Sequence, residues 1–145
     1  MLLPFALFAL LTPACGEDHG SDDHENEVIT TVVLTFTPEG GGASETFTFD
    51  DPDGDGGDAP IVDDIDLAAG GYTLTVAFEN RLEDPAEDIT EEVADESDEH
   101  QIFFTGSAVD GPATDNAGAA LAHSYEDTDA NGLAVGLDNA VEAVA

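Results

Sequence analysis

The feature that most constrains this chain is the imbalance of its charges. The sequence of 145 residues holds 34 aspartates and glutamates against one basic residue, Arg81, so that the formal net charge is -33 with histidine neutral. A surface this negative repels phosphate backbones and anionic headgroups, so we expect no nucleic-acid partner. The chain can fold compactly only where cations offset the repulsion, as in halophilic proteins that work in concentrated salt. We therefore expect salt screening across the surface and cations bound at particular loops.

The N-terminus is typical of an export segment. Residues 1–14, MLLPFALFALLTPA, have about the length of the apolar part of a secretory signal and are too short to span a bilayer, which takes ~20 helical residues. The only cysteine, Cys15, follows directly. Its placement resembles the lipobox of bacterial lipoproteins, in which the thiol is acylated and becomes the new N-terminus. We predict a lipoprotein signal peptide over residues 1–14 and lipidation of Cys15. Ordinary cleavage before a free Cys15 and a buried cysteine are the alternatives.

The segment after Cys15 is rich in acids. Residues 15–27, CGEDHGSDDHENE, contain almost nothing apolar and cannot contribute to a core. We predict an acidic flexible tether over residues 15–27 and a folded domain over residues 28–145. His19 and His24 lie among the tether's carboxylates, so a surface metal scavenger is an alternative role.

The folded domain is expected to be all-β. Residues 28–37 are a β-branched run with alternating Val, Thr and Leu, ended by Pro38 and a glycine-rich turn. Further strands are predicted at 45–50, 61–67, 72–80, 101–107 and 120–125, with 68–71 as the hairpin turn between the third and fourth. Short strands at ~8 to 12 residue spacing favour an antiparallel β-sandwich, Ig-like in type. Phenylalanines in these strands are expected in the core: Phe36, Phe47, Phe49, Phe78, Phe103 and Phe104.

One short acidic helix is predicted, over Asp84 to Asp95. Asp84 can cap it, Pro85 suits its first turn, and Ile89 with Val93 forms an apolar i, i+4 pair. The other faces carry like-charge i, i+4 pairs, each of which costs ~0.2 to 0.5 kcal/mol. Cations must therefore screen or bind this helix.

Two loops have the spacing of cation-binding turns. Residues 51–56 read DPDGDG and residues 127–132 read DTDANG, so both fit D-x-D-x-[DN]-G. Oxygens at positions 1, 3 and 5 converge where a glycine at position 6 permits a sharp turn, which is how Ca²⁺ gathers oxygen ligands. The predicted ligands are Asp51, Asp53, Asp55 and Asp58 in the first loop, and Asp127, Asp129, Asn131 and Asp138 in the second. Because Val62 occupies position 12 of the first loop, Asp63 or Asp64 could close that site in place of Asp58. The alternative is that these are ordinary turn residues in an acidic chain.

Catalytic motifs are scarce in the sequence. It contains no G-x-S-x-G elbow, no H-E-x-x-H, no paired cysteines and no lysine-bearing phosphate loop. We therefore predict that the protein is not an enzyme. His100 and His123 are the histidines outside the tether. We expect both to pack at strand edges, with a metal site between His100 and nearby carboxylates as the alternative.

Several stretches, in this order, carry a family resemblance: Cys15, VITTVVLTFTPEGGG, FDDPDGDGGDAP, FENRLEDPAEDITEEVADESDEHQIFF and YEDTDANGLAVGL. The chain resembles small bacterial envelope lipoproteins whose members often carry the automatic label "type 1 periplasmic binding fold superfamily protein". The likeness covers nearly all of residues 28–137, and DPAEDITEE and DEHQIFF are its specific parts. The label names a two-lobed fold that needs strand and helix alternation, which this chain lacks. Family members continue into further strands, so the resemblance implies a truncated sheet that lacks a C-terminal strand.

These features together predict a non-enzymatic, membrane-anchored lipoprotein that binds Ca²⁺ through its Asp-rich loops. Its expected location is the bacterial cell envelope, as an outer-membrane or periplasm-facing protein. The lipid bilayer is the expected partner through the acylated Cys15, and the protein or solute partner is not specified by the sequence. The alternative is a solute-binding or hydrolytic envelope protein, which would need a deep pocket lined by His100, Arg81 and aromatic residues.

Overall fold

The structure is a computed structural model that describes residues 27–54 and 56–144. The predicted signal peptide, Cys15 and the tether up to residue 26 lie outside the described residues. The elements, in chain order, are β1 (Thr31–Pro38), β2 (Glu45–Asp50), β3 (Ile61–Val62), β4 (Gly70–Asn80), β5 (Glu87–Asp88), α1 (Thr90–Asp95), β6 (Val109–Asp110), β7 (Leu121–Tyr125) and β8 (Asp138–Ala143). Among the described residues, no helix is long and apolar enough to cross a membrane.

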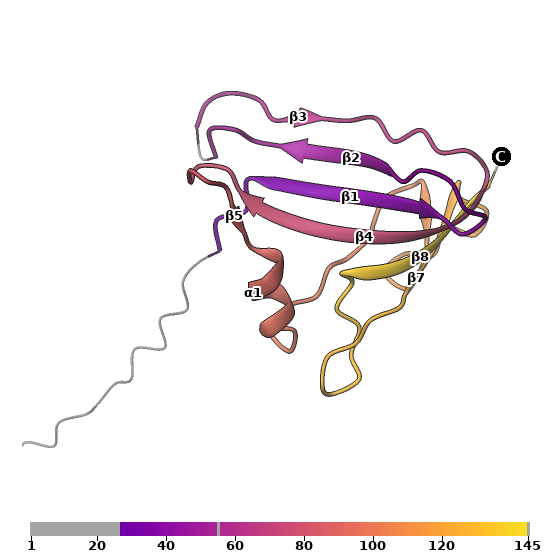
Figure 1. Ribbon diagram of the computed structural model, residues 1–145. Helices are drawn as coiled ribbons and strands as arrows, with labels where there is room; N and C mark the ends of the chain where they lie inside the picture. The colour runs from indigo at the N-terminus through magenta and orange to yellow at the C-terminus, as the bar shows by residue number, and fades with distance from the viewer. Residues whose placement is uncertain (1–26, 55, 145) are drawn as a thin grey trace, which may run out of the picture.

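All the strands belong to one hydrogen-bonded sheet. Their order is β3-β2-β1-β4-β8-β7-β6, and β5 pairs with one end of β4. The pairings are antiparallel except that of β6 with β7, which is parallel. The sheet curls into a half-barrel (Figure 1). The mostly β fold is therefore confirmed, whereas the strands are joined in one continuous sheet and not in two separate ones.

β1 and β4 form the middle of this sheet because their sequences alternate. In β4 the buried side chains of Tyr72, Leu74 and Val76 alternate with the exposed side chains of Thr73 and Thr75. β4 pairs with β1 along eight residue pairs and with β8 on its other side. A strand with two neighbours and one apolar face satisfies its backbone groups and buries hydrophobic area together.

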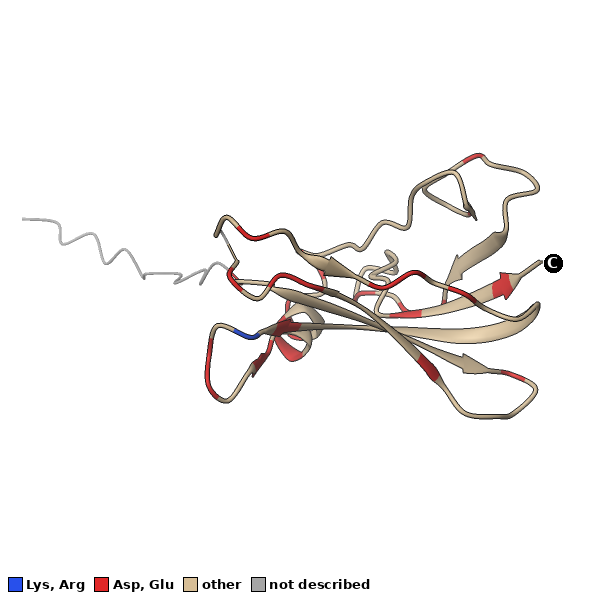
Figure 2. Ribbon diagram, turned by 90° about the horizontal axis from the view of Figure 1, so that it is seen from above, with Lys and Arg blue, Asp and Glu red and all other residues tan. Residues whose placement is uncertain are grey.

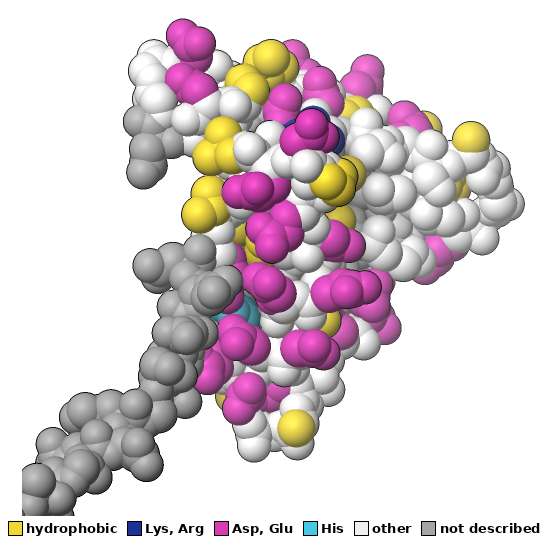
Figure 3. Space-filling model, turned by 60° about the vertical axis from the view of Figure 1, so that its left-hand side comes forward, with side chains coloured by type: hydrophobic (Ala, Val, Ile, Leu, Met, Phe, Trp, Pro, Cys, Tyr) yellow, Lys and Arg dark blue, Asp and Glu magenta, His cyan; other side chains and the backbone are white. Residues whose placement is uncertain are grey.

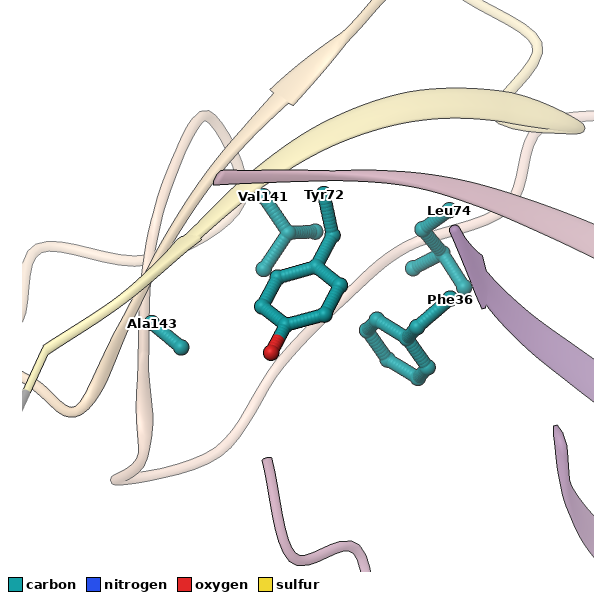
Figure 4. Close-up of a cluster of buried hydrophobic side chains, with 5 residues drawn as sticks. All are labelled: Phe36, Tyr72, Leu74, Val141 and Ala143. Atoms are coloured by element: carbon teal, nitrogen blue, oxygen red, sulfur yellow. The ribbon is translucent and has the colours of Figure 1, made fainter. Parts of the chain in front are cut away.

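The core lies inside the curl of the sheet. Phe36, Tyr72, Leu74, Val141 and Ala143 point into one cluster from β1, β4 and β8 (Figure 4). The ring of Phe36 packs edge-on against those of Phe47 and Tyr72, with centroids 5.8 and 6.1 Å away. Full burial of such a side chain contributes roughly 1.5 to 3 kcal/mol. Partly buried side chains pack against this cluster: Leu34, Phe47, Leu67, Phe104 and Leu121.

β8 is a strand that the sequence analysis did not predict. It lies between β4 and β7, not at an edge, and it buries Asn139, Val141 and Ala143 on one face. Asn139 is fully buried; its Oδ1 lies 2.9 Å from Nε2 of His123, and its Nδ2 donates to the carbonyl of Gly136 at 2.8 Å. A polar residue at a core position hides the alternation that a strand prediction depends on.

One strand prediction is wrong and another is too long. Residues 101–107 form no strand, and Phe103 on this segment is 63% exposed, so its predicted core position is also wrong. The predicted core position of Phe49 on β2 is wrong as well, because this side chain is 39% exposed. Only Ile61 and Val62 of the predicted strand 61–67 are extended in the sheet, and they pair with β2. The predicted hairpin between 61–67 and 72–80 is therefore absent from the described structure.

The helix is shorter than predicted. Residues Glu87 and Asp88 pair with β4 as β5, and the amide of Ile89 donates to the carbonyl of Phe78 at 3.0 Å. Helix α1 begins only at Thr90, whose Oγ1 accepts from the amide of Phe78 at 2.9 Å. Residues 87 and 88 therefore pair with the sheet, and the helix does not begin at the capping pattern of residue 84. The expected apolar pair of Ile89 and Val93 is confirmed as buried.

Candidate metal sites

Acidic side chains are spread over the whole molecule, and the single arginine lies at one end of the sheet (Figure 2). Nε of Arg81 donates to Glu79 at 2.8 Å, and its Nη1 donates to Asp50 at 3.2 Å. The hydrogen bond that Arg81 donates to Glu79 raises the pKa of Arg81 above its usual value. The remaining carboxylates of the described residues therefore have no lysine or arginine to pair with.

The first Asp-rich loop begins where β2 ends, beside the start of β1. The amide of Asp51 donates to the carbonyl of Thr30 at 2.8 Å, which fixes the loop against the segment that precedes β1. A cavity of about 610 Å³ lies here and is lined by Glu27, Asp51 and Asp53 together with apolar side chains such as Leu82. Three carboxylates therefore border one hollow.

Asp51 and Asp53 form a pair of carboxylates that lack hydrogen-bond partners for one oxygen each. Oδ1 of each is buried, and neither atom has a hydrogen-bond partner. Burial raises the pKa of Asp51, and the negative charge of the nearby Asp53 raises it further. Such a pair is stabilised either by a proton or by a bound cation.

Gly56 leaves room for the side chain of Asp53 in this turn. A Cβ on Gly56 would overlap the carboxylate of Asp53, so the side chain at position 3 of the loop folds over position 6. Oδ2 of Asp53 also accepts from the amide of Asp58 at 3.1 Å. The predicted ligands Asp51, Asp53 and Asp58 thus lie in one turn, while Asp55 is outside the described residues.

The second Asp-rich loop is organised differently. Oδ1 of Asp127 accepts from the amide of Gly136 at 2.8 Å, and its Oδ2 accepts from the amides of Leu137 at 2.7 Å and Asp138 at 3.1 Å. This carboxylate holds the two ends of the loop together. Asp138 lies at the start of β8 with an exposed side chain.

Asp129 is also engaged by its own loop. Its Oδ1 accepts from the amides of Asn131 and Leu133 at 2.8 and 2.7 Å, and its Oδ2 accepts from Nδ2 of Asn131 at 3.2 Å. These bonds, with that from Leu133 foremost, lower the pKa of Asp129. Gly132 has φ of +83°, so the sharp turn expected at position 6 is confirmed. The carboxylates here serve as acceptors for the backbone that surrounds them.

A third acidic group was not predicted as a set. Across the described ranges, the three residues whose ligand atoms all lie within 4.8 Å of one another are Glu27, Glu96 and His100. Glu96 and His100 are four residues apart, and this i, i+4 spacing is visible in the sequence. Nothing in the sequence places Glu27 beside them.

His123 occupies the interior of the curl. Its ring packs on Phe104 with centroids 4.3 Å apart and against Tyr125 at 4.8 Å. Nδ1 of His123 is buried without a hydrogen-bond partner. A cavity of about 300 Å³ lies beside it, lined mostly by apolar residues that include Phe103 and Phe104. Neither Arg81 nor His100 lines this cavity.

Comparisons with family models, with curated proteins and with solved structures found no match to this chain.

Proposed function

We propose that this protein is a non-enzymatic, lipid-anchored component of the bacterial cell envelope that binds Ca²⁺ through its Asp-rich loops. The observation that carries the Ca²⁺ proposal is the pair of buried, unpartnered oxygens, Oδ1 of Asp51 and Oδ1 of Asp53. Two carboxylates that face one hollow need a positive charge, and the chain offers no lysine for it. Ca²⁺ takes oxygen ligands and tolerates irregular geometry, so it suits this loop better than Mg²⁺ does.

The first loop is the stronger of the two proposed sites. Asp51 and Asp53 have oxygens free of hydrogen bonds, and the proposed set is completed by Asp55, Asp58 and water. In the second loop, Asp127 and Asp129 already accept backbone bonds. Ca²⁺ binding by Asp127, Asp129, Asn131 and Asp138 would use the remaining lone pairs of these oxygens. We therefore expect the first loop to bind more tightly.

Calorimetric titration of the full chain with Ca²⁺ tests this proposal. In 0.5 M NaCl at pH 7 we expect heat from binding that EGTA reverses. Asp53→Asn should weaken the tighter site by at least ~10-fold, because a charged ligand becomes neutral while the shape is kept. Asp115→Asn changes an exposed carboxylate between β6 and β7, at the other end of the strand order from β2, so it removes the same charge away from the pair and should change the affinity less than ~2-fold. Equal loss in both variants would mean that Ca²⁺ responds only to net charge.

The anchor is proposed from Cys15 and from the resemblance to envelope lipoproteins. Acylation of Cys15 would hold the domain at a bilayer through residues 15–27. The folded part would then present the loops at one end of its curled sheet, as an Ig-like sandwich presents the loops at its ends. Expression of the chain in a bacterial host should place it in the membrane fraction. Cys15→Ser should release it, and retention of this variant would contradict the anchor.

The interior cavity favours a second candidate function, the binding of a small apolar solute. About 300 Å³ is at the lower end of the volumes of ligand pockets, and His123 supplies a polar group among apolar walls. A fluorescent apolar probe such as ANS should then bind the folded protein with one site. Leu121→Trp, which fills the cavity from β7, should abolish binding. ANS fluorescence that increases only when the protein unfolds would argue against this function.

A further inference from the structure

We propose that Glu27, Glu96 and His100 form a binding site for a divalent transition metal, with Zn²⁺ as its probe, separate from the Asp-rich loops. Nε2 of His100 lies 3.3 Å from Oε1 of Glu27 and 3.5 Å from Oε2 of Glu96. All three ligand atoms lie within 4.8 Å of one another. The three side chains are partly exposed, so an ion can reach them from solvent.

The spacing fits a small tetrahedral ion. Zn²⁺ binds imidazole nitrogen and carboxylate oxygen at ~2.0 to 2.2 Å, which puts neighbouring ligand atoms of a tetrahedron ~3.3 to 3.6 Å apart. The two distances from His100 lie in this interval. Three protein ligands and one water would complete the coordination.

The hydrogen bonding of His100 adds to what the distances indicate. Its Nε2 is buried, and despite the two short distances neither carboxylate meets it with hydrogen-bond geometry. An ion between the three groups would satisfy the nitrogen and both oxygens together. An imidazole ligand favours Zn²⁺ and its neighbours over Ca²⁺, which prefers oxygen alone.

Among the described residues, no lysine or arginine is left to pair with this cluster. The single arginine, Arg81, is already bound to Glu79 and Asp50. Acidic side chains cover the face that carries α1, and a histidine lies among them (Figure 3). This field attracts divalent ions to the cluster, and the histidine selects among them.

The fold explains why the three residues meet. Glu96 ends α1, and the amide of Glu99 donates to the carbonyl of Glu96 at 2.8 Å, so the chain turns and returns His100 to the helix end. Glu27 comes from the segment before β1, which is held to β4 by the amide of Thr30 donating to the carbonyl of Glu79 at 3.0 Å. A bound ion would therefore tie the entry of the domain to α1.

Zn²⁺ uptake by the full chain tests the proposal. The background carries His19→Gln and His24→Gln, so that the imidazoles of the tether do not contribute, and millimolar CaCl₂ occupies the Asp-rich loops. We expect one Zn²⁺ per chain at pH 7.5. His100→Ala and Glu27→Gln should each weaken binding at least ~10-fold. Glu99→Gln, which removes a neighbouring charge, should change the affinity less than ~3-fold.

A second measurement distinguishes a site from a structural role. Zn²⁺ should slow hydrogen exchange at residues 28–31 and 93–97 in the background protein, and it should not do so in His100→Ala. Unchanged Zn²⁺ affinity in His100→Ala, or no Zn²⁺ uptake by the background protein, would overturn the proposal. Because Ca²⁺ is present throughout, this outcome is independent of the Ca²⁺ titration above.

Discussion

At the scale of single residues, aspartates in similar loops have pKa values that are shifted in opposite directions. The carboxylate of Asp129 is surrounded by donors, so its charge is stabilised and its pKa is lowered. The carboxylate of Asp51 is partly buried beside Asp53, so its charge is disfavoured and its pKa is raised. Both lie in loops with the same D-x-D motif. The motif therefore specifies a turn, and the local donors decide what its carboxylates do.

This contrast predicts pH dependences of opposite sign for two variants. A lowered pKa means that Asp129 stabilises the fold above the unfolded value of ~3.9 and loses this contribution as pH falls through its folded pKa. The stability gap between the parent and Asp129→Asn should therefore shrink as pH falls below ~4. A raised pKa means the reverse for Asp51. Its contribution is present below ~3.9 and is lost as pH rises through its folded pKa.

Asp51→Asn should accordingly gain stability relative to the parent as pH rises from 3.5 to 7. Urea unfolding of the three proteins in 1 M NaCl with chelator, followed by circular dichroism, measures both trends. Each variant removes one charge, so a general charge effect would move both in the same direction. Trends of the same sign would therefore contradict the assignment of these two environments.

At the scale of elements, alternation of side chains is what made strands predictable. β1, β2 and β4 follow it and appear where they were expected. β8 escapes because Asn139 takes a core position, where His123 and Gly136 satisfy its amide. The segment 101–107 has strand-like residues, yet its hydrogen bonds go to scattered partners: the amide of Ile102 donates to the carbonyl of Val135 at 2.7 Å, and the carbonyl of Ile102 accepts from the hydroxyl of Tyr125 at 2.8 Å. Pairing partners decide such cases, and they are not visible in local sequence.

The candidate sites were predictable to a similar degree. The two Asp-rich turns and their glycines follow from spacing alone. That Asp51 and Asp53 keep free oxygens while Asp127 does not depends on which backbone amides come near, and this is set by the sheet. The cluster of Glu27, Glu96 and His100 joins segments far apart in sequence, so only the fold could bring it together.

The position of β8 inside the sheet predicts a strong contrast between two prolines. Ala140 has neighbours on both sides, Thr73 in β4 and Ser124 in β7. Ala140→Pro should cost ~3 kcal/mol or more in the free energy of unfolding, because it removes a ladder hydrogen bond and strains the strand. Val62→Pro lies on the edge strand β3, where the adjacent amide of Asp63 makes the bond to β2. It should cost less than ~1 kcal/mol.

Urea unfolding monitored by circular dichroism measures both costs. If the last described strand were dispensable, the two substitutions would have similar small effects. That result would show that the half-barrel is held together by β1 to β4 alone.

At the scale of the whole molecule, the fold has to withstand the repulsion between its carboxylates. The chain carries a formal charge of -33, and the main core cluster of its curled sheet consists of five buried side chains. Repulsion between carboxylates acts over a Debye length of ~30 Å at 0.01 M salt and ~3 Å at 1 M. At low salt the repulsion therefore spans the domain, whereas at high salt it reaches only the nearest neighbours.

We therefore expect stability to rise steeply with salt. In 10 mM buffer with chelator the far-ultraviolet spectrum should show loss of β structure, and NaCl up to 1 M should restore it. KCl should act as NaCl does, because screening depends on ionic strength, whereas sucrose should not replace either salt. Ca²⁺ or Zn²⁺ at micromolar concentration adds too little ionic strength to screen, so any shift of the NaCl midpoint by them measures binding at defined sites. A free energy of unfolding that stays constant from 10 mM to 1 M NaCl would mean that the core alone outweighs the charge.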